Sequence, residues 1–494
     1  MNLFAFGSNG CGQLGLGHEE DVSTPTKCQF TPPTNEQDQE QKQKDKIIQI
    51  AAGGNHTLLL TETGSVYASG CNTDGRCGIS PQNLNDQHDQ DQDQDQARTQ
   101  THEYNTNINT FQRVILTDST GTTVDKFKCI AATWEGSILV SEIETNNEMK
   151  PDKVFVHGSS TKGELGHNST TLSPGTSLPN FPPQNTSIRS ITASMNHAVV
   201  VLSNGTVYGW GASRKGQLGQ NLKSEKIIFT PSEIEVPFLA TQAVSGREFT
   251  FIVGDKSKGE IVVLGDQLNR WGICDVADEK RLRERIRIRI RERERQAQTQ
   301  VEERDREQEQ EQGNESGNEK SGIQLEARAT LASVDSGISS HSHASTSATS
   351  PTASTMWGFE DIGASWHGIY VLVRAGTGTR AQLDNPNPKS ESESDKNEDG
   401  IIVSWGRNDR GQLPDSTLPS VQRLAVGSEH ALVLLADGSV AAFGWGEHGN
   451  CGPDTDNRGN VSGFKVISLD ASLNGNGRVV GVGAGCATSW VIVD

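Results

Sequence analysis

The chain has 494 residues, of which 52 are glycine and only 33% are hydrophobic, and its formal net charge is −19. This composition predicts a turn-rich, all-β core diluted by polar sequence that does not fold. The acidic balance argues against direct nucleic-acid binding by the core, and the absence of an apolar run near ~20 residues argues against a membrane span.

Motifs for catalysis, metals or export are missing from the sequence. The N-terminus carries no secretory signal, and eight scattered cysteines without a Cys-x-x-Cys pair indicate reduced thiols in an intracellular protein. There is no Gly-x-Ser-x-Gly elbow, Walker loop or His-Glu-x-x-His helix. We therefore expect a protein that is not an enzyme, with no catalytic residues, no metal and no cofactor.

Two short patterns alternate along the chain, and each occurs seven times. The first is a strand that ends in Gly and enters a glycine turn, as in "FAFGSNGCGQLG" from residue 4 and "VYGWGASRKGQLG" from residue 207. The second is a small-residue turn that enters an apolar strand, as in "IAAGGNHTLLL" from residue 50. Its aligned copies share one equivalent position, occupied by His56, Gly136, His197, Phe249, Gly368, His430 and Thr488.

Hairpin signals join the apolar strands to the Gly-ending strands that follow them. Asn-Gly at 204–205 and Asp-Gly at 437–438 supply the positive φ angles of tight turns. Repeated small antiparallel sheets predict one seven-bladed β-propeller over residues 1–494. The chain starts with a Gly-ending strand and ends with an apolar one, so we expect residues 3–7 to pair with 488–493 and close the ring.

Four polar segments interrupt the repeats, and we expect them to be disordered loops: 29–46, 80–110, 275–356 and 376–399. The third contains Arg at every second position from Arg281 to Arg295, a period that disfavours an amphipathic helix and would give a strand one cationic face. Such a tract could bind RNA, an acidic partner or an import receptor. The favoured interpretation is a low-complexity expansion neutralised by nearby Glu.

His56, His197 and His430 recur at the equivalent position, which favours a structural role over a catalytic one. A residue repeated in separate blades is expected to clamp its turn or the adjacent strand by hydrogen bonds. Function is expected at residues that depart from the repeat.

Three of the seven equivalent turns carry bulky side chains: Trp134–Glu135, Arg247–Glu248 and Trp366–His367. Equivalent turns of a radial array project to one face, so these six residues predict a partner-binding patch with Trp and Arg anchors. The alternative is that Trp134 and Trp366 pack between neighbouring blades.

The alternating Gly-x-x-x-x-Gly-Gln-Leu-Gly and Ala-x-Gly-x-x-His patterns resemble the regulator of chromosome condensation propeller family. The segments "AFGSNG", "QLGLGH" and Thr24–Pro25 resemble its fungal alpha-tubulin-suppressor branch. This resemblance implies a cytoplasmic and nuclear propeller that binds a small zinc-ribbon protein shared by diphthamide synthesis and Elongator-dependent tRNA wobble-uridine modification. The "SWHG" segment around Trp366 and His367 carries that resemblance best.

The wider family implies a second hypothesis, guanine-nucleotide exchange on a Ran-like small GTPase. The acidic candidates for such a role are Glu135, Glu248 and Asp361. Against it, the founding member is implied to carry a basic tail before its first blade, whereas the first strand here begins at Leu3.

Overall fold

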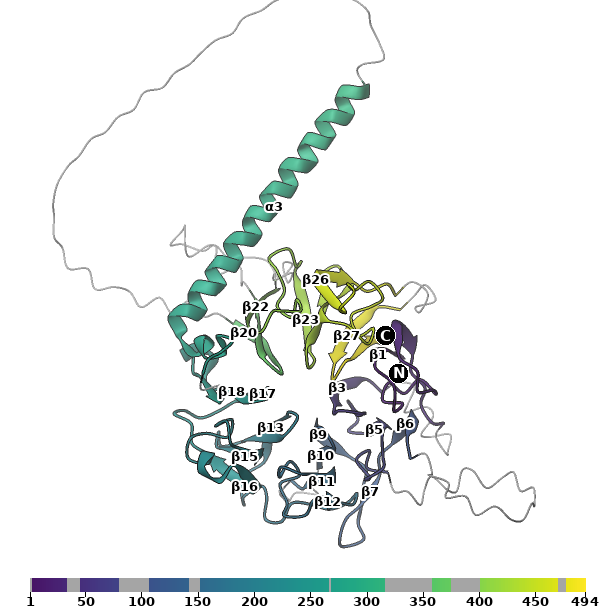
Figure 1. Ribbon diagram of the computed structural model, residues 1–494, viewed down its shortest axis with the longest axis vertical. Coiled ribbons are helices and arrows are strands. Elements are labelled where there is room, and N and C mark those ends of the chain that lie inside the picture. The colour runs from purple at the N-terminus through teal and green to yellow at the C-terminus, as the bar shows by residue number, and fades with distance from the viewer. Residues whose placement is uncertain are drawn as a thin grey trace, which may run out of the picture. The chain divides into compact units, whose positions relative to one another are not determined.

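Seven small antiparallel sheets follow one another around a ring (Figure 1). The computed structural model describes residues 2–32, 45–79, 106–141, 152–265, 268–315, 358–374, 400–469 and 477–494. Contacts divide the chain into one unit of Met1–Arg289 with Trp357–Asp494 and a second unit of Ile290–Met356. The seven sheets lie in the first unit, which confirms the predicted all-β, seven-bladed propeller.

We number the sheets as blades 1 to 7 in chain order, with the closing sheet last. Blade 1 consists of β3 (Ile47–Ala52), β4 (His56–Thr61), β5 (Val66–Gly70) and β6 (Ile108–Arg113). Blade 2 consists of β9 (Phe127–Ala132), β10 (Gly136–Ser141), β11 (Val154–Ser159) and β12 (Thr171–Leu172). A ribbon of β7 (Leu116–Thr117) and β8 (Thr123–Val124) connects them. Blade 3 consists of β13 (Ile188–Ala193), β14 (His197–Leu202), β15 (Val207–Ala212) and β16 (Ile227–Ile234), with η1 (Lys223–Glu225) before β16.

Blades 4 and 5 have three strands each in the described residues. Blade 4 consists of β17 (Gln242–Ser245), β18 (Phe249–Val253) and β19 (Ile261–Gly265), with η2 (Lys256–Lys258) between the last two. Blade 5 consists of β20 (Gly358–Ser365), β21 (Gly368–Arg374) and β22 (Gly400–Gly406). Blade 6 consists of β23 (Val421–Val426), β24 (His430–Leu435), β25 (Val440–Trp445) and β26 (Asn460–Val466).

Blade 7 joins the two ends of the chain. It is built from β27 (Val479–Ala484), β28 (Thr488–Val493), β1 (Asn2–Gly7) and β2 (Val22–Lys27), in that order. The register places Asn2 opposite Val493 and Gly7 opposite Thr488, and the two chain ends lie side by side in Figure 1. The predicted pairing of residues 3–7 with 488–493 is therefore confirmed.

The second strand of a blade is its most buried element, because it lies inside its own sheet and between neighbouring blades. Every residue of β4, β10, β14 and β24 is buried, as the apolar runs in the sequence require. The apolar clusters cross from blade to blade, and one joins Leu58 of blade 1 to Phe127 and Leu139 of blade 2. The core is thus a series of layers between blades, which no single blade completes alone.

A glycine is the last or next-to-last residue of the third strand in every blade, opposite the first residue of the second strand. Gly70, for example, has φ +115° and lies opposite His56, and a Cβ there would lie 2.4 Å from the carbonyl oxygen of Asn55. Only glycine fits such an approach without a shift of the backbone. This contact explains why the Gly-ending strand recurs in the sequence.

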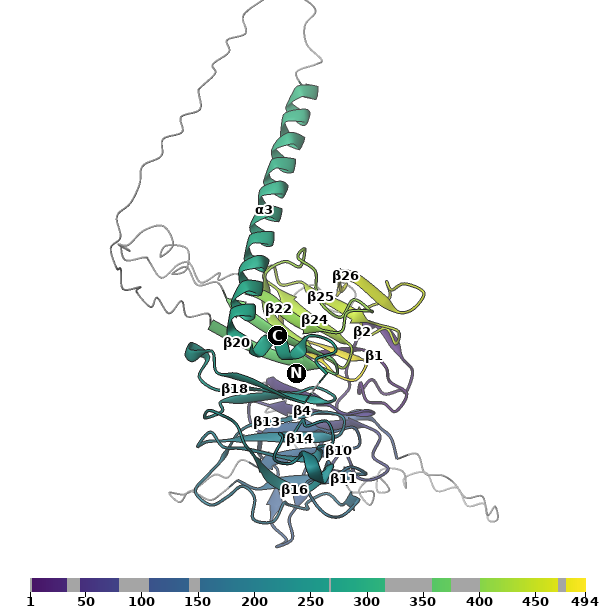
Figure 2. The ribbon, with the colours of Figure 1, turned by 60° about the vertical axis from the view of Figure 1, so that its left-hand side comes forward.

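The arginine-rich tract is helical, which corrects the prediction of a disordered or extended segment at 275–356. Residues 273–277 form η3 (Ile273–Ala277), and α3 (Glu279–Glu315), the long teal helix in Figure 2, follows. Arg, Glu and Gln are good helix formers, and Leu282 and Ile286 are four residues apart on one helical face and buried. Nη1 of Arg285 donates to the carbonyl oxygen of Ser404, 2.6 Å away, so α3 is anchored on blade 5 at its start.

The predicted limits of two further insertions were also wrong. Residues 29–32 and the start of β6 at Ile108 lie within the predicted insertions 29–46 and 80–110, yet they belong to the ordered ring. Phe30 and Phe111 form a β-bridge with stacked rings, so the two segments hold each other. Residues 45–46 and 106–107 are described as well. Residues 33–44, 80–105 and 316–356 and the insertion 376–399 lie outside the described residues.

Candidate functional site

The turns between the first and second strands gather at one end of the ring, which we call the turn face. The loops that follow the third strands lie at the same end, because each third strand ends opposite the start of a second strand. All six residues of the predicted patch lie in three of these turns. The predicted convergence on one face therefore agrees with the backbone geometry.

Trp134 of blade 2 and Trp366 of blade 5 meet over the central opening of the ring. Their ring centroids are 6.1 Å apart with planes inclined by 47°, and the guanidinium carbon of Arg247 lies 5.6 Å from the Trp366 ring. Both tryptophans are partly exposed and Arg247 is exposed. We call Trp134, Trp366 and Arg247 the tryptophan cluster.

Backbone hydrogen bonds between blades hold this cluster in place. The Arg247 amide donates to the Trp366 carbonyl (3.0 Å), the Trp366 amide to Ser428 (2.9 Å), and the Trp134 amide to Met195 (3.2 Å). A Cβ on Gly54 of blade 1 would lie 2.8 Å from the Trp134 ring, so this ring also covers the adjacent blade. The two tryptophans thus touch each other across the ring in addition to packing against neighbours.

His367 points into a charged network between blades 5 and 6. Its Nδ1 lies 3.3 Å from Oε1 of Glu429, which is 3.4 Å from Nη1 of Arg407, and Gln412 donates to the other carboxylate oxygen at 2.8 Å. Burial favours a raised pKa for Glu429, but hydrogen bonds from His367 and Gln412 and the charge of Arg407 bring the pKa below its ordinary value. The ionised carboxylate therefore fixes the His367 ring, and we call these four residues the charged seam.

Glu135 and Glu248 do not join the tryptophan cluster. Glu135 lies 3.9 Å from Arg76 of blade 1, and Glu248 lies 3.3 Å from Lys215 of blade 3. Both are ion pairs across a blade boundary, with the two glutamates close to half exposed. Asp361 lies within β20, away from the turn, and burial raises its pKa.

His56, His197 and His430 are fully buried at the starts of β4, β14 and β24. Each Nε2 reaches a hydroxyl of the next blade: Ser137 at 3.0 Å, Thr250 at 3.0 Å and Ser489 at 2.9 Å. Each hydroxyl in turn donates to a loop carbonyl of the histidine's own blade, those of Arg76, Gln217 and Asn450. The hydroxyl proton is thereby used, so the hydroxyl oxygen accepts from Nε2–H of the histidine. We call these three junctions the bridged seams.

Burial lowers the pKa of these histidines, to about 3 for His56 and about 4 for His197 and His430. A neutral ring that spans two blades suits a structural bridge. It does not suit a proton-transfer residue at neutral pH, because the proton would have to enter the core.

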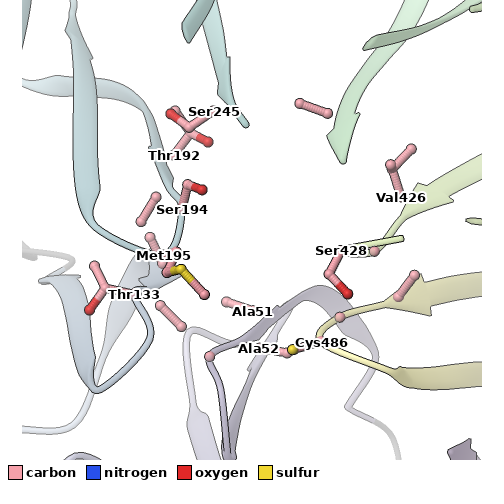
Figure 3. Close-up of a pocket in the computed structure, with 18 of the residues that line it drawn as sticks. Ala51, Ala52, Thr133, Thr192, Ser194, Met195, Ser245, Val426, Ser428 and Cys486 are labelled. Carbon is pink, nitrogen blue, oxygen red and sulfur yellow. The ribbon is translucent and has the colours of Figure 1, made fainter. Parts of the chain in front are cut away.

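A cavity of about 230 Å³ lies beneath the tryptophan cluster, inside the ring. Its wall is made of first strands and turns, with Thr192, Ser194, Ser245, Ser428 and Cys486 around the opening in Figure 3. No residue that lines it is charged. In the described part of the chain, no group of three His, Cys, Asp or Glu is placed to hold a metal ion, and no helix there is apolar enough to cross a bilayer.

Sequence reasoning missed Glu429 and the cavity. Glu429 occupies the position before the second strand, the place that Glu135 and Glu248 occupy in their own blades, so the alignment contained a usable signal. The cavity had no sequence signal, because its wall is made of small, apolar and hydroxyl-bearing residues of first strands and turns that are ordinary for such strands and turns.

The ring and its repeated Gly and His positions define a seven-bladed propeller built from internal repeats. Two family models, both described as Regulator of chromosome condensation (RCC1) repeat, match residues 2–60 and 204–253, and residues 47–76 and 188–217. The matched segments therefore carry RCC1 repeats, and the repeat pattern and the fold resemble those of RCC1-repeat propellers.

Known proteins show the same likeness. An RCC1 repeat-containing protein of Schizosaccharomyces pombe is 24% identical over 496 residues, covering 100% of this chain and 99% of that protein. The secretion-regulating guanine nucleotide exchange factor of Mus musculus is 22% identical, covering 92% of this chain and 76% of that protein. The crystal structure of Prp20p from Saccharomyces cerevisiae, whose title concerns binding to Gsp1p and histones, aligns with a TM-score of 0.55 at 16% identity. It covers 100% of this chain and 91% of Prp20p, a likeness that shows the fold.

Proposed function

We propose that this propeller is a non-enzymatic docking protein whose turn face binds a small zinc-ribbon protein. The observation that carries the proposal is the tryptophan cluster, in which two partly exposed indole rings and an exposed guanidinium lie together over the central opening. Trp and Arg are the residue types that most often dominate binding energy at protein interfaces.

The turn face is pre-organised for such a role. The Trp366 backbone is fixed by hydrogen bonds on both sides, and the neighbouring His367 ring is held by Glu429. Side chains that are already ordered lose less entropy when a partner binds, so more of the contact energy appears as affinity.

The partner and pathway follow from the resemblance to the fungal alpha-tubulin-suppressor branch, which is strongest around Trp366 and His367. In this proposal the protein acts in the cytoplasm and nucleus and supports diphthamide biosynthesis on elongation factor 2 and Elongator-dependent tRNA wobble-uridine modification. Its action is steric: it holds the zinc-ribbon partner and controls access to the partner's redox metal.

The test is a binding titration of the purified zinc-ribbon protein against wild type and the Trp366→Ala/His367→Ala variant. We expect at least a tenfold loss of affinity, because the variant removes one indole ring and the ring held by Glu429. The matched control is Trp445→Ala at the end of β25, where the guanidinium carbon of Arg410 lies 4.1 Å from the centre of the indole. Wild-type affinity of the Trp366→Ala/His367→Ala variant would refute the proposal.

A second candidate is guanine-nucleotide exchange on a Ran-like GTPase. The similarity to a mouse guanine nucleotide exchange factor and the likeness to Prp20p favour it. Two of its acidic candidates, Glu135 and Glu248, are engaged in ion pairs between blades, so they are less available to a GTPase. Release of a fluorescent guanine nucleotide from Ran decides between the two: acceleration by catalytic amounts of this protein would establish exchange.

A further inference from the structure

The cavity beneath the tryptophan cluster has the chemistry of a site for an uncharged group. Ala51 and Ala52, Val426 and Met195 give it apolar wall, and Thr192, Ser194 and Ser428 add hydroxyls (Figure 3). A charge placed there would lose its hydration without finding a counter-charge, which is costly. The cavity thus excludes carboxylates, phosphates and ammonium groups.

One hydroxyl in this wall has no partner. The side chain of Ser245, at the end of β17, is 8% exposed, and its Oγ forms no hydrogen bond in the structure. Buried polar groups are normally paired, and an unpaired one carries a desolvation cost that needs an explanation. Rotation of the Ser245 side chain toward the cavity would let a bound hydrogen-bonding group supply the missing partner.

The Arg247 guanidinium lies at the same opening and has no carboxylate partner among the described residues. Three other cations of the turn face have one: Arg76 pairs with Asp74, Lys215 with Glu248, and Arg407 with Asp409. The structure shows the Arg247 guanidinium against the Trp366 ring and gives it no ion pair among the described residues. An exposed guanidinium at the edge of an uncharged opening is suited to an incoming carboxylate.

We propose that the cavity is a socket for one uncharged side chain of the docked partner, bearing a hydroxyl or amide. The segment that carries it passes the tryptophan cluster and places a neighbouring carboxylate against Arg247. This inference rests on the proposed docking function and specifies what the partner must present: a projecting loop or chain end with a neutral polar residue beside an acidic one.

The decisive experiment removes the unpaired hydroxyl or fills the cavity without touching the turn face, and separately removes the Arg247 guanidinium from that face. Affinity for the zinc-ribbon protein is measured by titration calorimetry for Ser245→Ala, for Ala364→Leu in β20, and for Arg247→Ala. We expect about a tenfold loss for each. The control, Ser232→Ala, removes a hydroxyl from the outer strand β16 and should bind as wild type.

Thermal unfolding of each variant separates binding from folding. Ser245→Ala should melt no lower than wild type, because the hydroxyl it removes has no partner in the free protein. If Trp366→Ala weakens binding while Ser245→Ala and Ala364→Leu, both folded, bind as wild type, the socket is wrong and the docking function stands. If Trp366→Ala and wild type bind equally, or wild type does not bind at all, both proposals fail.

Discussion

Two kinds of blade junction use the same imidazole chemistry in opposite ways. In the bridged seams, His430 and its equivalents are buried and neutral, and they donate to a hydroxyl of the next blade. In the charged seam, His367 is partly exposed and meets the carboxylate of Glu429. The first arrangement stabilises the ring, and the second orients a side chain on the turn face. A histidine's place in the repeat thus separates a structural role from a surface role.

The two kinds of seam should differ most in how their contribution to the unfolding free energy changes at acidic pH. A histidine whose pKa falls from 6.5 to about 4 on folding stabilises the protein above pH 6.5 and loses that contribution as the pH falls, because only the unfolded chain takes up the proton. Each bridged seam should lose about 2 kcal/mol between pH 7 and pH 5, on the order of 5 kcal/mol for three. Unfolding free energies measured by denaturant across this range test it. His430→Gln should reduce the slope against pH by close to one proton, and an unchanged slope would contradict the bridge.

A single bridge can be broken at neutral pH. His430→Ala removes a fully buried ring and leaves the Ser489 hydroxyl without its donor, so we expect a loss of about 3 kcal/mol in unfolding free energy. Urea unfolding monitored by far-UV circular dichroism measures the loss. Ser489→Ala should cost less, because the ring stays in place. A His430→Ala variant as stable as wild type would show that the bridge carries no stability.

Substitution in the charged seam should cost less unfolding free energy than substitution in a bridged seam. Glu429→Gln removes the ionised carboxylate but keeps the shape, and we expect a loss of about 1 kcal/mol because His367 and Arg407 remain partly solvated. Since the pKa of Glu429 is lowered, the wild-type contribution is present above the ordinary carboxyl pKa and falls away below it. A loss as large as that of His430→Ala would mean that the seam is structural after all.

The smallest effect is expected for His367 itself. His367→Ala should change the unfolding free energy by less than about 0.5 kcal/mol, because its imidazole is partly exposed and makes one bond. The same urea titration measures it beside His430→Ala. Comparable losses in the two variants would remove the distinction between bridged and charged seams.

Much of the ring could be predicted because the same sequence pattern recurs in each blade. Glycine recurs at the position of Gly70 because a Cβ there would clash with a backbone carbonyl. Histidine recurs at the position of His56 because a hydroxyl of the next blade lies within hydrogen-bond distance of its ring. The contact of Trp134 with Trp366 was not predictable in detail, because blades 2 and 5 are distant in the sequence and only the diameter of the opening decides whether their rings meet.

For the arginine tract, the sequence pattern predicted the wrong secondary structure. Its period of two suggested an extended strand, but Leu282 and Ile286 fall on one helical face and Arg285 finds a carbonyl on blade 5. Period alone could not reveal this, since the binding surface for the helix is formed by residues more than a hundred positions away. The charges made the segment look unfoldable, and helix propensity with a few tertiary contacts decided otherwise.

The pairing of β1 with β28 also means that the ring cannot close until β28 has been synthesised. The first strand leaves the ribosome long before its partner, and at about 5–20 residues per second the wait lasts roughly half a minute to a minute and a half. During that interval the nascent chain displays an unmatched strand edge that another chain could capture. Synthesis of β28 therefore ends the interval in which the edge of β1 is open to aggregation.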